Sequence, residues 1–112
     1  MAEYLILIYD NESVTTPEDW GRLMTGHQQF ATDHGAALRG GNALQPSTTA
    51  TSIRPDGAGG FTVTDAPFAE TKEALGGYYV VEAADLEAAM AIARDVPTVA
   101  GGVEVRPVMS FD

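Results

Sequence analysis

The sequence predicts an α+β domain in which two helices cover one face of an antiparallel sheet. Three observations support this: an apolar run at residues 4–9, two amphipathic helical patterns, and further stretches rich in β-branched and aromatic residues. In chain order they give strand, helix, hairpin, strand, helix and strand. This is the βαββαβ order of a ferredoxin-like fold with an extra hairpin. A chain of 112 residues is the size of a single domain, expected over 1–112.

The first strand and the first helix have the clearest local signals. Every side chain in residues 4–9 is apolar, which is typical of a strand covered on both faces. Thr16 is the expected N-cap of the first helix, Pro17 suits its first turn, and Gly35 is its expected end. Side chains at helical spacing follow the cap: Trp20, Leu23, Met24, His27, Phe30, Ala31, His34 and Leu38.

The middle of the chain is dominated by turn-forming residues. Glycine, proline and small polar residues predict a loop over 40–48. A hairpin is expected over 49–64, with its turn at the PDGAGG segment. The remaining elements are a strand near 77–83, a helix capped by Asp85 and ended by Pro97, and a last strand over 103–109.

The predicted sheet has one uncovered face. Right-handed crossovers place both helices on the same side. The other side would be bare, although the first strand is apolar on both faces. A second copy of the chain would cover it, so the sequence predicts a homodimer with two sheets packed face to face.

Composition excludes several classes of function. The formal net charge is -10 and the six Lys and Arg residues are scattered singly. Nucleic acids and anionic membranes bind clustered basic residues, so neither is expected as a partner. The chain has no cysteine, which excludes disulfides and thiolate chemistry. A cytoplasmic location is expected, because the N-terminus shows no signal-peptide pattern and no apolar run could span a bilayer.

The most distinctive stretch is TDAPFAETKEALGGYY, at residues 64–79. The chain resembles the YCII-related domain family, in the subgroup with a D-G-P-F signature, here Asp65-Ala66-Pro67-Phe68. The resemblance covers nearly the whole chain and includes other positions: His27, Leu44, Pro46, Ala50, Arg54, Glu104, Arg106 and Pro107. It implies a dimer of the dimeric α/β-barrel type with a cleft between helix and sheet in each subunit.

The resemblance also implies candidate site residues. Distant members of the family act on cyclic or chlorinated aromatic compounds, and a His–Asp pair has been suggested as their catalytic element. In this sequence the pair would be His27 and Asp65. Many family members are encoded beside extracytoplasmic-function sigma factors, which implies a functional link to such a factor.

Each candidate has a structural alternative. His27 is either a core residue with satisfied nitrogens or an acid/base catalyst facing a cleft. Asp65 either bonds backbone N–H groups of its turn or orients His27, and the two roles are compatible. Arg54 either pairs with Asp65 or Glu70, or holds a substrate carboxylate. Lys72, the single lysine, belongs to a site or reflects composition alone.

Tyr78 and Tyr79 must face opposite sides of their strand, so one belongs to the core or an interface and the other lines the cleft. The candidate substrate-binding residues are Arg54, Phe68, Glu70, Lys72 and Tyr78.

Two classes of function follow. The first is a small-molecule-binding protein that acts as a cofactor-free acid/base enzyme, of isomerase or lyase type, on a small anionic or cyclic substrate. No metal is expected, because two histidines without HExxH spacing make no convincing zinc site. The alternative is a non-catalytic ligand-sensing or interaction module in a sigma-factor pathway. A third possibility is that residues 64–79 are only a structural clasp.

Overall fold

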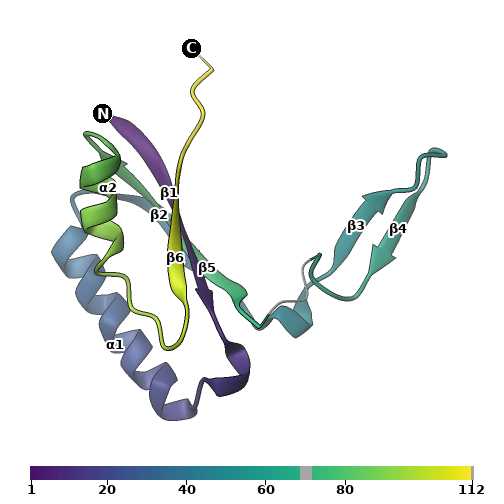
Figure 1. Ribbon diagram of the computed structural model, residues 1–112, viewed down its shortest axis with the longest axis horizontal. Helices are drawn as coiled ribbons and strands as arrows, with labels where there is room; N and C mark the ends of the chain where they lie inside the picture. Colours follow the sequence, from purple (N-terminus) through teal and green to yellow (C-terminus); the bar gives the residue numbers. More distant parts are fainter. Residues whose placement is uncertain (69–71, 112) are drawn as a thin grey trace.

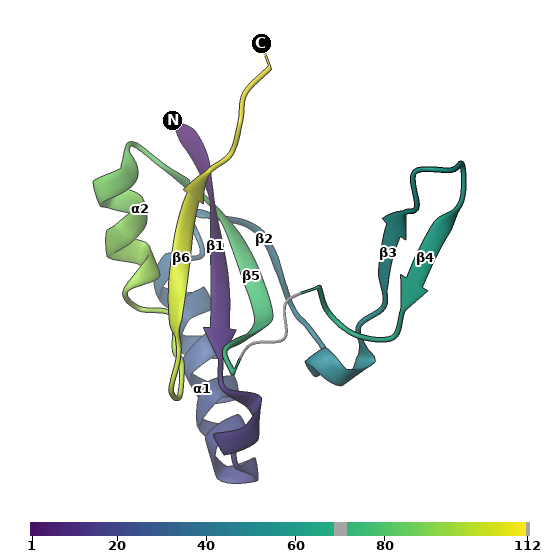
Figure 2. The same cartoon turned by 45° about the vertical axis from the view of Figure 1, so that its right-hand side comes forward.

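The computed structural model describes residues 1–68 and 72–111 (Figure 1). Its main sheet has four antiparallel strands in the order β2-β5-β1-β6. The elements are β1 (Ala2–Asp10), α1 (Pro17–His34), β2 (Leu38–Ala43), β5 (Ala74–Ala83), α2 (Leu86–Ala93) and β6 (Gly102–Pro107). Both helices lie on one side of this sheet (Figures 1 and 2). The α+β prediction is confirmed, and the arrangement is compatible with a ferredoxin-like fold.

A second sheet stands apart from this body. Among the described residues, strands β3 (Ser52–Pro55) and β4 (Phe61–Thr64) form a two-stranded sheet, with Ile53 opposite Val63. They project from the side of the main sheet opposite the helices (Figures 1 and 2). The radius of gyration is 16.0 Å, whereas a compact chain of this length has about 13 Å. The projecting hairpin accounts for this extended shape.

The loop predicted over 40–48 is wrong in its first half, because Leu38–Ala43 forms the edge strand β2. Leu38 therefore belongs to this strand, after α1 has ended at the expected Gly35. Gly40 and Gly41 make this strand difficult to predict from the sequence, since neither carries a side chain typical of β structure. A Cβ at Gly41 would lie 2.7 Å from the ring of Tyr79, so glycine permits the close approach of β5.

The core lies between the helices and the main sheet. Side chains of β1 alternate, as Tyr4, Ile6 and Ile8 are buried beneath the helices. Leu5 and Leu7 point to the opposite face, where they stay partly exposed. The buried apolar residues are Tyr4, Ile6, Ile8, Phe30, Val81, Ala83, Ala89, Ala93 and Val96.

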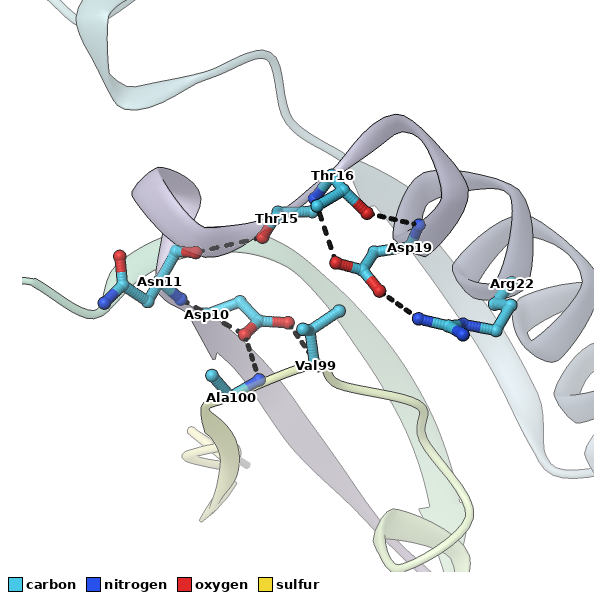
Figure 3. Close-up of polar contacts among 8 residues, drawn as sticks. All are labelled: Asp10, Asn11, Thr15, Thr16, Asp19, Arg22, Val99 and Ala100. Atoms are coloured by element: carbon cyan, nitrogen blue, oxygen red, sulfur yellow. Dashed lines mark hydrogen bonds and ion pairs between the residues drawn. The ribbon is translucent and has the colours of Figure 1, made fainter.

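The N-terminus of α1 is capped as the sequence predicts. The Thr16 hydroxyl accepts a hydrogen bond from the Asp19 N–H at 3.1 Å, and the Asp19 carboxylate accepts one from the Thr16 N–H at 2.9 Å (Figure 3). Arg22 donates to the same carboxylate. The backbone hydrogen bond from Thr16 is the main cause that lowers the pKa of Asp19. This reciprocal cap fixes the direction in which α1 leaves the loop after β1.

Gly26, which weakens the helix intrinsically, has a packing role. A Cβ at this position would lie 3.0 Å from the side chain of Pro97. The glycine therefore lets the loop that follows α2 pack closely against the middle of α1. In the described ranges no helix is both long and apolar enough to cross a bilayer.

Replacement of Thr16 by alanine is expected to lower the free energy of unfolding by about 1 kcal/mol, because the Asp19 N–H loses its acceptor. The midpoint of thermal unfolding is expected to fall by about 4–8 °C. Thr25→Ala is the matched control, since the Thr25 hydroxyl is exposed and bonds only the Gly21 carbonyl within the same helix. Equal midpoints for the two variants would show that the cap contributes nothing.

Candidate functional site

A cleft of about 470 Å³ opens between α1 and the main sheet. This volume lies within the range of small-molecule sites. Helix α1 contributes Trp20, Leu23, Met24 and His27 to one wall, and Tyr79 of β5 lies on the sheet side. The lining is mostly apolar, so its few polar side chains can fix the orientation of a ligand.

His27 and Tyr79 meet in this cleft. The distance between His27 Nδ1 and the Tyr79 hydroxyl oxygen is 2.7 Å, and both side chains are half-buried. The Tyr79 ring also packs on Phe30, with the ring centroids 4.7 Å apart. His27 and Phe30 lie one turn apart on α1, and Tyr79 is opposite Ile6 in the sheet. The helix spacing and the strand register together create the contact.

Burial sets the protonation states of this pair. It lowers the pKa of His27 below its usual 6.5 and raises the pKa of Tyr79 above its usual 10.0. Both side chains are therefore neutral at pH 7. The contact with Tyr79 occupies Nδ1, so Nε2 is the ring nitrogen that can exchange a proton with a ligand. Nε2 has no hydrogen-bond partner among residues 1–68 and 72–111.

Two carboxylates at the cleft have structural partners. Asp10 accepts hydrogen bonds from the N–H groups of Val99 and Ala100, each at 2.7 Å (Figure 3). Glu12 accepts one from the Ser47 N–H at 2.8 Å. These bonds hold the loops around the cleft in place. Among the described residues of the lining, none is Lys or Arg.

A second, wider cavity of about 1060 Å³ adjoins the cleft. Asp65 and Lys72 line it, together with residues that follow β1 and residues that flank the hairpin. The two cavities share lining residues: Glu12, Leu44, Pro46 and Ala74. A ligand that extends past this shared wall would reach both.

A sequence model of the YCII-related domain matches residues 2–112. The chain belongs to the YCII-related domain family. Among its relatives is the uncharacterized protein R00369 of Rhizobium meliloti (strain 1021), which is 37% identical over 116 residues, with 96% of this chain and 93% of that protein covered. The match covers nearly all of both chains, and the name of the relative states no activity.

The YCII-related chain does not bring the predicted pair His27 and Asp65 into a direct hydrogen bond. His27 bonds Tyr79, while Asp65 lines the second cavity with Lys72. Tyr79 rather than Tyr78 places its hydroxyl beside the histidine. The Tyr78 hydroxyl accepts a hydrogen bond from Asn42 at 3.0 Å.

The other candidates lie on or near the hairpin. The Arg54 guanidinium stacks over the ring of Phe68, with its carbon 4.4 Å from the ring centroid. Within the described part of the YCII-related chain, Arg54 forms no ion pair, and neither residue lines the cleft or the second cavity. Glu70 lies outside the described residues.

Sequence reasoning missed the roles of Tyr79 and Asp10. Alternation along β5 showed that one of the two tyrosines faces the helices, but the choice depends on the register with β1. Asp10 ends an apolar strand, which marks it as a loop residue but does not reveal the N–H groups of a segment about ninety positions later. No three His, Asp or Glu side chains in the described ranges gather in a way that could hold a metal ion.

The imidazole of His27 is expected to titrate below pH 6.5, because burial disfavours its charged form. In the unfolded chain it titrates near its usual value, so below pH 6.5 the unfolded state binds more protons. The free energy of unfolding therefore falls as the pH is lowered through this window. NMR titration of the ring Cε1–H measures the midpoint.

The variant His34→Gln identifies the His27 resonance, since the chain has two histidines. The variant His27→Gln is expected to remove this part of the pH dependence of stability. A midpoint at or above 6.5 would contradict the burial of His27.

Proposed function

We propose that this protein binds a small cyclic molecule in the cleft between α1 and the sheet, and transfers a proton there without a cofactor. The contact between His27 and Tyr79 carries this proposal. It holds a neutral, half-buried imidazole in the wall of a mostly apolar cavity of suitable volume. Buried ionisable groups with shifted pKa values in a cleft are typical of acid/base sites.

In this mechanism Nε2 of His27 is the acid/base. In an isomerisation, it takes a proton from a carbon next to a carbonyl and returns it at a second position. In an elimination, it takes a proton from a carbon next to the one that bears the leaving group, and the leaving group departs with the bonding electrons. Isomerisation and elimination both balance in this way, with no net oxidation. Tyr79 positions the ring: with the proton on Nδ1, its oxygen accepts that N–H and stabilises the imidazolium that forms.

The charges around the cleft favour a neutral cyclic substrate over an anionic one. Asp10 and Glu12 line the cleft, and the chain carries a net charge of -10, which repels anions. Asp65 and Lys72 are proposed to contact the far end of a longer ligand, across the wall that the two cavities share. Asp65 then acts on the ligand instead of orienting His27.

We further propose membership of the D-G-P-F subgroup and a cytoplasmic location. Asp65-Ala66-Pro67-Phe68 supports the subgroup. In the described residues, positive φ occurs at glycines alone, so Ala66 adopts an ordinary backbone conformation and its methyl group causes no strain. The Ala66 carbonyl accepts a hydrogen bond from the Ser52 hydroxyl, which ties the signature to β3.

A homodimer of the dimeric α/β-barrel type is also proposed. The sheet face opposite the helices carries Leu5 and Leu7 of β1 with Tyr78 and Val80 of β5, all partly exposed. Adjacent apolar side chains on an uncovered sheet face favour burial against a second sheet.

The substrate can be sought with a panel of neutral cyclic ketones and lactones incubated in D₂O. Proton transfer at carbon appears in NMR spectra as loss of the exchanging C–H signal. For any compound that exchanges, His27→Ala is expected to lower the rate at least about 100-fold. Tyr79→Phe is expected to lower it about tenfold, because one hydrogen bond to the imidazole is lost.

His34→Gln is the matched control, since His34 pairs with Asp95 at 2.7 Å and does not line the cleft. It is expected to retain the full rate. Exchange that survives in His27→Ala would refute the mechanism. Binding without exchange by any compound would favour the ligand-sensing alternative.

A further inference from the structure

The β3–β4 hairpin exposes apolar side chains that the described residues of one copy leave largely uncovered. Ile53, Phe61 and Val63 are 55%, 67% and 61% exposed. The strand register places them on one face, with Ile53 opposite Val63 and Pro55 opposite Phe61. We call Ile53, Phe61 and Val63 the hairpin strip. Of residues 52–64, none belongs to the buried apolar core.

A two-stranded hairpin with an uncovered apolar face lacks the packing that normally stabilises such a sheet. An isolated two-stranded sheet is marginal in water and needs further strands or a packed face. The strip exposes on the order of 300 Å² of apolar surface, given the size of aromatic and aliphatic side chains. This extent is similar to that of the largest apolar patch on a typical monomer, and such patches are often functional.

We propose that the hairpin is a dimerisation arm whose strip packs against a second copy of this chain. Charge favours this partner. Residues 40–64 carry one arginine and one aspartate, so they are neutral in a chain of net charge -10. Two copies repel each other over most of their surfaces, and the neutral hairpin is a place where they meet without that cost.

Position supports the same partner. The hairpin projects from the side of the sheet opposite the helices (Figures 1 and 2). A copy that covers the open sheet face at Leu5, Leu7 and Val80 therefore lies beside the hairpin. A stable interface removes about 800 Å² from each partner, more than the strip supplies alone. The strip and the open sheet face form two parts of one interface.

The arm also connects assembly to the second cavity. Ala50 and Asp65 line that cavity and lie just outside β3 and β4, respectively. The position of the hairpin thus sets the spacing of the cavity walls. The inference extends the proposed homodimer and is independent of catalysis in the cleft.

The test uses the purified full chain, so that a second copy is the only available partner. Sedimentation equilibrium gives the dimer dissociation constant of the native protein and of Ile53→Thr/Phe61→Thr/Val63→Thr. Threonine keeps the β propensity of the strands while removing most of the apolar surface. The constant is expected to rise about 100-fold or more, which equals about 2.7 kcal/mol.

The matched control is Thr62→Ala/Thr64→Ala, on the opposite face of β4, which is expected to change the constant by less than about threefold. The chain has no cysteine, so Phe61→Cys and Thr62→Cys can each carry one maleimide–benzophenone. Photolysis is expected to give a covalent dimer from Phe61→Cys and far less from Thr62→Cys. NMR spectra of the main sheet confirm that each variant is folded.

Two results would contradict the proposal that the hairpin is a dimerisation arm. If Leu7→Glu on the open sheet face dissociates the dimer while the strip variant associates like the native chain, the homodimer stands and the arm is wrong. If the native chain is monomeric at 100 µM, the arm and the sheet-face dimer both fail. Neither result affects the acid/base proposal for His27.

Discussion

The packing of Tyr79 between α1 and the edge strand determines where the cleft lies. Its ring rests on Phe30, which is 1% exposed, and its hydroxyl reaches His27 one helical turn away. Gly41 leaves the space that the ring occupies from the other side. If α1 were shifted so that Phe30 no longer packed on the Tyr79 ring, His27 would move away from the Tyr79 hydroxyl.

The elements with local signals were the ones that the sequence could predict. Thr16, Pro17 and Asp19 form a helix start within four positions, and the structure shows the cap they imply. The burial of β1 alternates beneath the helices, as a strand requires. Strand β2 could not be predicted, because its glycines are required by the approach of β5, a constraint from residues nearly forty positions later.

The site was predictable only in part for the same reason. The position of His27 beside the cleft could be expected, since a histidine on an apolar helix face is visible in the sequence. Its partner could not be expected, because the choice between Tyr78 and Tyr79 depends on strand register, which is a property of the whole sheet. The loops around the cleft likewise depend on Asp10, which bonds N–H groups far along the chain. The resemblance to the family supplied Asp65, and the structure places it in the neighbouring cavity.

The central claim is that ligands bind in the cleft between α1 and the sheet. Trp20 is the single tryptophan of the chain, is 52% exposed and lines this cleft, so its fluorescence reports occupancy there. A cyclic compound that raises the midpoint of thermal unfolding is expected to change the Trp20 emission with the same dissociation constant. A compound that stabilises the fold saturably and leaves the Trp20 emission unchanged would place the binding site elsewhere and contradict the account.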